Sequence, residues 1–309
     1  MLGFQSICSK RQNYSRKSGI FAAICHCACF FSLIFAPIIF ANASGAAANT
    51  ANVTDANKAK TWICGPAFDP ASTRNANFLP LTSPLDPPEM VDGLVFSNTP
   101  KTLWRLADIA FVPGFEDDAL VAMRRMAGTA FEQAVYSDDV DFAGRKLMDL
   151  RDDARLLWQE VLLERGLAIL LPEGKRSVDV FANAEERAIV KRLGIWGDDV
   201  AAPYHYGGSP DRAGILPDAN LAVGHFAVID AVLQRIEDRE WRSYLNFGEN
   251  WRSDFTVMVG RDLRDEIVAN GQHMENWIGQ TIRIRGVIED RGGPYIELAE
   301  LAALCLARP

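Results

Sequence analysis

The stretch Thr281-Ile282-Arg283-Ile284-Arg285-Gly286-Val287 alternates isoleucines with arginines, which is typical of a β-strand. Arg283 and Arg285 therefore share one face of that strand, and Glu289 and Glu297 are the carboxylates expected to balance them. Similar strand patterns precede and follow this stretch, at residues 224–235, 241–247, 254–259 and 295–298. A single amphipathic helix is expected between the third and fourth of these strands, at about 262–269.

Five strands with one helix between the third and the fourth are the element order of an OB-type barrel. Aromatic and basic residues occur along it, including Tyr244, Phe247, Trp251 and Arg252. OB folds bind single-stranded nucleic acid through faces of this kind. However, strand residues of a small barrel alternate between core and surface, so about half of these side chains are expected in the core.

The residues before 197 predict a second set of elements. Strands are expected at 94–96, 102–106, 146–150 and 167–171, and helices at 118–135, 155–165 and 184–193. Residues 197–220 are rich in proline and glycine, which places a domain boundary there. The sequence therefore predicts an α+β chain that is mainly β, with two modest domains. Trp158 and Trp196 are interpreted as packing aromatics.

The N-terminal segment differs in composition from the rest of the chain. A basic head without acidic residues is followed by an apolar run at residues 20–40 and by Ala41-Asn42-Ala43. These are the parts of a secretory signal peptide covering residues 1–43. The run is also long enough to remain uncleaved as a membrane anchor. The protein is thus expected to be periplasmic or secreted, or anchored in the inner membrane by residues 20–40, its only contact with a membrane.

The charge of the chain without residues 1–43 argues against general nucleic-acid binding. The full chain has 32 basic and 40 acidic residues, and four basic residues fall in the N-terminal segment, so 28 against 40 leaves −12. Nucleic-acid binders use basic surface to neutralise phosphates, although a local basic groove is compatible with this net charge. Residues 44–88 are expected to form a flexible, proline-rich linker. Beyond residue 43 only Cys64 and Cys305 remain, and whether they form a disulfide is left open.

Three stretches of the first half resemble the thermonuclease family, whose type member is staphylococcal nuclease. They are Arg105-Leu106-Ala107-Asp108-Ile109-Ala110, Asp141-Phe142-Ala143-Gly144-Arg145, and Leu162 through Ala168 followed by Ala184 through Gly197. Their order and spacing fit together. The resemblance implies a nuclease-like five-stranded OB-type barrel over residues 89–199.

The second half resembles the extra C-terminal barrel found behind such domains in exported proteins of Gram-negative bacteria. This resemblance covers residues 221–309 and is carried by Tyr244 through Gly248, Trp251 through Thr256, Gly279 through Gly286 and Gly293 through Leu298. Together the two stretches imply an exported protein with two OB-type barrels.

Members of this family cleave phosphodiesters in DNA and RNA with one bound Ca²⁺, and the resemblance carries only part of that site across. Arg105 and Arg145 fall on the two phosphate-binding arginines. Leu94 and Ala110 replace metal-binding acids, and Pro113 stands where the general base belongs. Hard cations need oxygen ligands, and hydrolysis needs a base within reach of water. Asp108 is a weak substitute for a metal ligand, and Glu116, Asp117 or Asp118 could lend an acid from a loop. The favoured interpretation is that Asp108 ends a strand and that the three acidic residues start a helix.

The leading functional hypothesis is therefore an exported, non-catalytic binding or structural module with a degenerate thermonuclease-like site and no cofactor. The first alternative is a Ca²⁺-dependent nuclease, an endonuclease acting on DNA or RNA, with a remodelled site. The second alternative is an oligonucleotide or anion binder that uses Arg105 and Arg145 without cleavage. Protein partners are not indicated by the sequence.

Overall fold

The computed structural model describes residues 59–65, 79–80, 96–99, 102–127, 131–173, 176–197, 205–207, 223–250 and 252–308. The predicted signal peptide, most of the predicted linker, Leu94 and Trp251 lie outside these residues. No helix within the described part of the chain is long and apolar enough to cross a membrane. All described residues fall within one compact unit, Thr54–Pro309.

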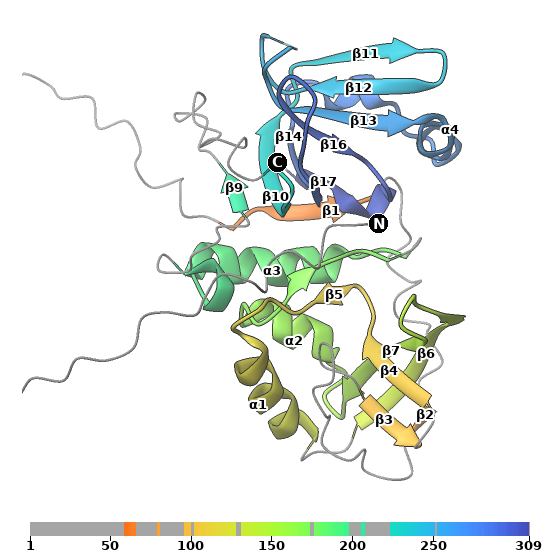
Figure 1. The fold of residues 1–309 in the computed structure, drawn as a ribbon, viewed down its shortest axis with the longest axis vertical. Coiled ribbons are helices and arrows are strands. Elements are labelled where there is room, and N and C mark those ends of the chain that lie inside the picture. Colours follow the sequence, from red (N-terminus) through yellow and green to blue (C-terminus); the bar gives the residue numbers. More distant parts are fainter. Residues whose placement is uncertain are drawn as a thin grey trace, which may run out of the picture. The chain divides into compact units, whose positions relative to one another are not determined.

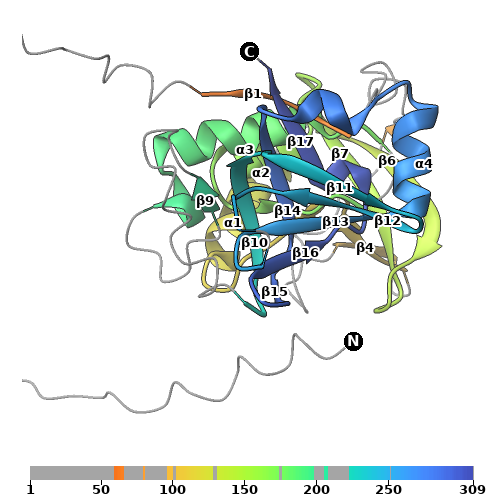
Figure 2. The ribbon, with the colours of Figure 1, turned by 90° about the horizontal axis from the view of Figure 1, so that it is seen from above.

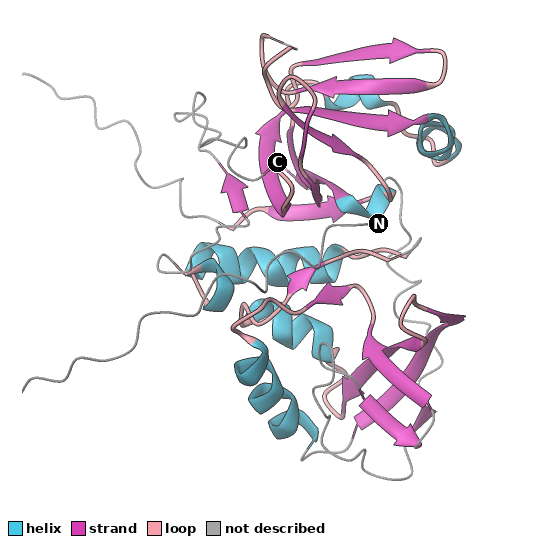
Figure 3. Cartoon of the chain, viewed as in Figure 1, coloured by secondary structure: helices cyan, strands magenta, loops and turns pink. Residues whose placement is uncertain are grey.

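The chain is α+β, as predicted, with strands forming most of the regular structure and four α-helices among the described residues (Figures 1 and 3). Three five-stranded sheets and one two-stranded sheet are formed. Each has an open strand order, so the predicted pair of closed five-stranded barrels is not confirmed.

The first half contains one five-stranded sheet, in the order β2-β6-β7-β4-β3. Its strands are Leu79–Pro80 (β2), Phe96–Thr99 (β3), Thr102–Leu106 (β4), Phe131–Val140 (β6) and Arg145–Asp152 (β7). Ile109–Ala110 (β5) pairs separately with Ile169–Leu170 (β8). The helices are Glu116–Ala127 (α1), Trp158–Glu164 (α2) and Asp179–Lys191 (α3), followed by the 3₁₀ turn Gly194–Trp196 (η2).

The helix predicted at 118–135 is shorter than expected. α1 ends at Ala127, and residues from Phe131 onwards form β6. β6 is antiparallel to β7, with Gln133 and Ala134 buried. Pairing with a neighbouring strand therefore overrides the local helical spacing of apolar residues. The acidic residues in the first turn of α1 and the basic residues in its last turn both interact favourably with the helix dipole.

Helices α2 and α3 hold the core of the first half together. Trp158, Leu162 and Phe181 are almost fully buried in one cluster with Met148 of β7. Burying such a side chain contributes about 1.5–3 kcal/mol. Trp158 and Trp196 are both buried, in agreement with their interpretation as packing residues.

Two glycines of the resemblance motifs allow the ends of α2 and α3 to meet. A Cβ on Gly166 would lie 2.1 Å from the carbonyl oxygen of Leu193, and one on Gly194 would lie 2.0 Å from that of Gly166. Both residues also have positive φ. The approach is fixed by a hydrogen bond of 2.9 Å from the Ile195 amide to the Gly166 carbonyl. Any larger residue at either position would force the helix ends apart.

Two further five-stranded sheets contain all five strands predicted for the second half, together with two short strands from earlier in the chain. One has the order β1-β17-β14-β10-β9 and the other the order β11-β12-β13-β16-β15. The first comprises Thr61–Cys64 (β1), Leu304–Arg308 (β17), Thr281–Val287 (β14), Phe226–Val232 (β10) and His205–Gly207 (β9). The second comprises Arg235–Arg239 (β11), Arg242–Asn246 (β12), Thr256–Gly260 (β13), Pro294–Glu297 (β16) and Glu289–Asp290 (β15).

One helix, Arg261–Ala269 (α4), follows β13 as predicted. The 3₁₀ turns Met274–Trp277 (η5) and Leu301–Ala303 (η6) complete this half. Its core includes Phe255, Trp277 and Ile284.

Strand β1 corrects part of the predicted linker. Thr61–Cys64 falls within residues 44–88, yet it forms a regular strand antiparallel to β17 (Figures 1 and 2). Its partner lies at the far end of the chain, so local composition does not reveal the pairing. Cys64 stands opposite Cys305 in this ladder, and the two are joined by a disulfide.

The other edge of β1 is bonded to side chains of α3. Asp179 accepts from the Cys64 amide at 2.7 Å, and Glu186 accepts from the Lys60 amide at 2.9 Å. Asn183 accepts from the Trp62 amide at 2.8 Å and donates to the Trp62 carbonyl at 3.0 Å. These residues lie on one face of α3 because they are spaced by three or four positions. The helix thereby satisfies an edge that would otherwise be open to another strand.

Candidate functional site

The two arginines that the resemblance assigns to phosphate binding lie close together. Arg105 is on β4 and Arg145 begins β7, and these two strands are parallel neighbours. Arg145 is placed by the turn that precedes it, in which Oδ1 of Asp141 accepts from the amides of Ala143 and Arg145, both at 2.9 Å. Asp side chains commonly stabilise turns in this way.

Both arginines are bonded to carboxylates. Oδ2 of Asp141 accepts from Nε of Arg105 and from Nε of Arg145, each at 2.8 Å. Glu173 binds the two terminal nitrogens of the Arg105 guanidinium, accepting from Nη1 at 2.7 Å and also from Nη2. Bidentate pairs of this kind are among the stronger protein hydrogen bonds. An anion approaching Arg105 would therefore compete with two carboxylates that are already bound.

The charge arrangement changes the ionisation of the groups involved. Burial alone would raise the pKa of Asp141, but hydrogen bonds from Arg105 and from the backbone and side chain of Arg145 lower it to about 2. Burial alone would lower the pKa of Arg105, yet Glu173 and Asp141 raise it. Asp141 and Arg105 are thus held as an ionised pair at neutral pH.

We expect the Asp141 carboxyl to titrate with a pKa of about 2, against 3.8 for an unperturbed aspartate. Because the folded-state pKa is the lower one, Asp141 contributes stability that is fully present above about pH 4. This contribution is lost as the pH falls towards about 2. Carboxyl ¹³C NMR measures the titration directly, and Arg145→Gln should move the pKa upwards. The matched surface variant Arg124→Gln should leave it unchanged, whereas a pKa near 4 in the unmodified protein contradicts the arrangement.

Asp108, the substitute metal ligand suggested by the sequence, is bonded to other residues of the chain. It has a φ of 59° and is 1% exposed. Its Oδ1 accepts from the Glu173 amide at 2.7 Å, and its Oδ2 is paired with Arg176. Burial raises the pKa of Asp108 against the opposing effect of Arg176. Its oxygens are therefore occupied in fixing the loop that carries Glu173.

Arg176 extends this network to β7. It pairs with Asp149, which also accepts from Nε2 of Gln159 at 2.6 Å. The sequence did not single out Glu173, Arg176 or Asp149. Both Glu173 and Arg176 lie in a loop, and their contacts depend on the sheet beside them. Within the described residues there is no group of three or more His, Cys, Asp or Glu side chains suited to a metal ion.

The remaining positions of the family site carry no acid where they are described. Ala110 is half-buried in β5, and Pro113 is exposed in the turn before α1. Glu116 begins α1 and accepts from the Gly114 amide, and its side chain has no longer-range partner among the described residues. The acidic residues Glu116, Asp117 and Asp118 therefore form the first turn of a helix, in agreement with the interpretation that they start one.

The prediction for Arg283 and Arg285 was wrong about their partners. Both are buried, and Arg283 pairs with Asp230 and Glu186 while Arg285 pairs with Glu185. Glu289 pairs instead with the exposed Arg291. Inward-facing arginines on β14 need carboxylates on the inner side, and α3 supplies two of them from about a hundred residues away in sequence.

The aromatic residues singled out in the second half separate into core and surface. Phe247 is buried against Phe255, with ring centroids 5.1 Å apart. Tyr244 is half-buried and Arg252 is exposed on the outer face of the second sheet. Phe247 and Arg252 lie outside β12 and β13, so strand alternation alone does not decide their placement.

Comparison with known proteins gives this geometry no further support. The sequence matches no protein-family model and no curated protein sequence.

Proposed function

We propose that this protein is an exported, non-catalytic binding or structural module that has a thermonuclease-like fold. One observation carries the proposal, namely that Asp141 bridges both Arg105 and Arg145 while Glu173 occupies the outer fork of Arg105. The two cations that would bind a phosphodiester are neutralised by the chain itself. Hydrolysis would also require a metal ligand and a base, and Ala110 and Pro113 offer neither.

The finer fold assignment is part of the same proposal. In the second half β10 continues into β11 after two residues, and β14 continues into β15 after one. With each pair counted as a single bent strand, the pairings run β10/β11 to β12, β13, β16, β15/β14 and back to β10. That ring of neighbours supports an OB-type barrel over residues 221–309, with the helix α4 in the expected place. Residues 89–199 would be the nuclease-like domain.

The disulfide between Cys64 and Cys305 supports the location. Disulfides persist mainly in oxidising compartments such as the periplasm or the cell exterior. The composition of residues 1–43 supports the same location, either as a cleaved signal peptide or as an uncleaved anchor.

A cleavage assay tests the lack of catalysis. The purified protein is incubated with single-stranded DNA at neutral pH, with Ca²⁺ or with a chelator. We expect equal rates in both conditions, because the site lacks the acids that would hold the ion. Calcium-dependent cleavage that Arg145→Ala abolishes and Arg124→Ala leaves intact would establish the remodelled nuclease instead.

A further inference from the structure

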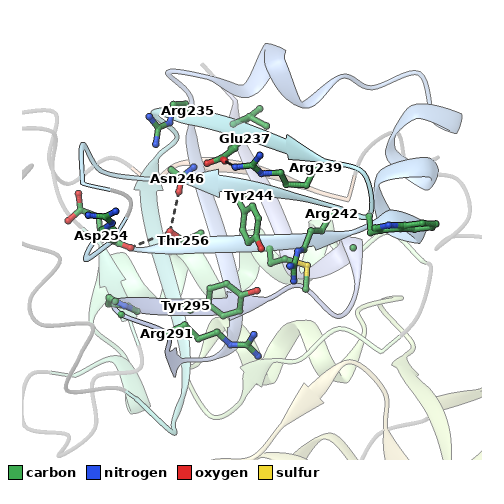
Figure 4. Close-up of a pocket in the computed structure, with 18 of the residues that line it drawn as sticks. Arg235, Glu237, Arg239, Arg242, Tyr244, Asn246, Asp254, Thr256, Arg291 and Tyr295 are labelled. Carbon is green, nitrogen blue, oxygen red and sulfur yellow. Dashed lines mark hydrogen bonds and ion pairs between the residues drawn. The ribbon is translucent and has the colours of Figure 1, made fainter.

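A large groove of about 1430 Å³ lies on the outer face of the sheet formed by β11, β12, β13 and β16 (Figure 4). Alternate residues of β12 and β13 reach it, together with consecutive residues of β11 and β16. β12 contributes Arg242, Tyr244 and Asn246, while Ser243 and Leu245 of the same strand are buried. The groove is therefore a regular strand-built surface, made by side chains that point away from the core. It lies in the opposite half of the chain from Arg105 and Arg145.

The groove is rich in arginine. Its five arginines are Arg235, Arg239, Arg242, Arg252 and Arg291. Arg239 is paired with Glu237 and Arg291 with Glu289, both on the surface. Among the described residues, exposed Arg235 and exposed Arg242 form no ion pair, and the guanidinium of Arg242 lies 5.5 Å from the centroid of the Tyr244 ring. At least two guanidinium forks thus remain able to bind an anion bidentately.

Aromatic rings in the groove hold guanidinium groups. Arg242 lies over Tyr244, and Arg291 lies over Tyr295 at 4.6 Å from the ring centroid (Figure 4). Tyr295 is only 6% exposed. Nucleic-acid grooves of this kind depend on open ring faces on which bases stack. The tyrosines here instead fix the positions of arginines, which favours recognition of anionic groups over recognition of bases.

Carboxylates stand among the arginines. Glu237, Glu240 and Asp254 line the same groove. A continuous phosphodiester chain would set phosphates against these acids, whereas a ligand with hydroxyl groups could donate hydrogen bonds to them. The groove therefore combines positively charged guanidinium groups with carboxylate oxygens that accept hydrogen bonds. This combination fits a ligand that carries both anionic groups and hydroxyls.

The groove floor contains an unsatisfied donor. Asn246 is 3% exposed, and its Nδ2 forms no hydrogen bond with any described residue. Its Oδ1 accepts from Oγ1 of Thr256 at 3.3 Å (Figure 4). A buried donor without an acceptor destabilises the fold. A ligand hydroxyl that settled between Asn246 and Thr256 would remove that destabilisation.

We propose that this groove binds an acidic oligosaccharide, a sugar chain that carries carboxylate groups. The carboxylates bind Arg235 and Arg242, and the hydroxyls donate to Glu237 and Asp254. The inference supplies the ligand for the binding module proposed above and rests on that function. It does not depend on the thermonuclease-like site.

Calorimetric titration of the purified protein with hexagalacturonate tests the inference. We expect saturable binding at low salt, and binding at least about tenfold weaker for the neutral hexasaccharide cellohexaose. The variant Arg235→Gln/Arg242→Gln should weaken binding of hexagalacturonate about tenfold or more, because two charge-assisted contacts are lost. Arg124→Gln removes one arginine charge from α1, outside the groove. This variant should bind like the unmodified protein. Unchanged unfolding midpoints would show that both variants are folded.

Three outcomes overturn the inference. They are no detectable binding of hexagalacturonate, equal binding by the double variant, and binding of a twelve-residue oligothymidylate as tight as that of the sugar. The last would identify a nucleic-acid groove. None of them bears on the cleavage assay, so the absence of catalysis and the nature of the ligand can fail separately.

Discussion

Replacing Arg283 by methionine will lower the free energy of unfolding by about 3–5 kcal/mol, the usual effect of leaving a buried carboxylate unpaired. Nε of Arg283 donates to Oδ1 of Asp230 at 2.6 Å, and Nη2 donates to Oδ2 of Asp230 and to Oε2 of Glu186, each at 2.7 Å. The guanidinium also lies 4.2 Å from the ring centroid of Trp62. Its side chain is 1% exposed, so water cannot replace these contacts.

The position of Arg283 makes this effect larger than that of an ordinary ion pair. It joins β14 of the second half to α3 of the first and to β1. Glu186 also accepts from Nε1 of Trp62 at 3.1 Å. Loss of Arg283 therefore leaves Asp230 and Glu186 buried at the contact between α3 and the second half.

Arg291→Met is the matched control. Arg291 also pairs with a glutamate, Glu289, but the two side chains are 51% and 46% exposed. Solvent screens such exposed pairs, so we expect Arg291→Met to lower the free energy of unfolding far less than Arg283→Met does. Urea-induced unfolding followed by tryptophan fluorescence measures both variants. Similar losses for Arg283→Met and Arg291→Met would contradict the role assigned to the buried pair. Should Arg283→Met not fold, the milder Glu186→Gln should still lose more than the control.

Removing the disulfide with Cys64→Ala/Cys305→Ala will cost about 2–5 kcal/mol. The two residues are 241 positions apart, so the bond restrains nearly the whole unfolded chain. The disulfide also holds β1 against β17. β1 in turn is hydrogen-bonded to α3, so it forms one of the contacts between α3 and the second half.

Reduction supplies the control for this prediction. A reducing agent should lower the unfolding midpoint of the unmodified protein by about as much as the double substitution does. The same agent should leave the midpoint of the double variant unchanged. If the variant unfolds at the same denaturant concentration as the oxidised protein, the disulfide does not stabilise the fold.

The sequence predicted elements best where their pattern was local. β14 was predicted at its observed bounds, because the alternation of isoleucine and arginine is visible within seven residues. β1 was not predicted, because the pairing that makes Thr61–Cys64 a strand comes from residues 305–308. Likewise, the end of α1 was misplaced, because β7 determines that residues after Phe131 are extended.

The candidate site shows the same division. Placing Arg105 and Arg145 together required only the order of the motifs. Their two carboxylate partners differed in how far the sequence could reveal them. Asp141 was already inside a quoted motif, whereas Glu173 lies 68 positions from Arg105 and is positioned by Asp108. Glu289 and Glu297 were expected to balance Arg283 and Arg285, but the buried Arg283 pairs with Glu186 of α3.

The state of Arg105 and Arg145 in solution tests the central claim most directly. Both Nε–H groups can be followed by ¹⁵N NMR while single-stranded oligonucleotide is added in the presence of Ca²⁺. Because Asp141 accepts from both Nε atoms, we expect neither signal to move. Saturable shifts of both signals would show that the two arginines still bind a phosphodiester and would contradict the account.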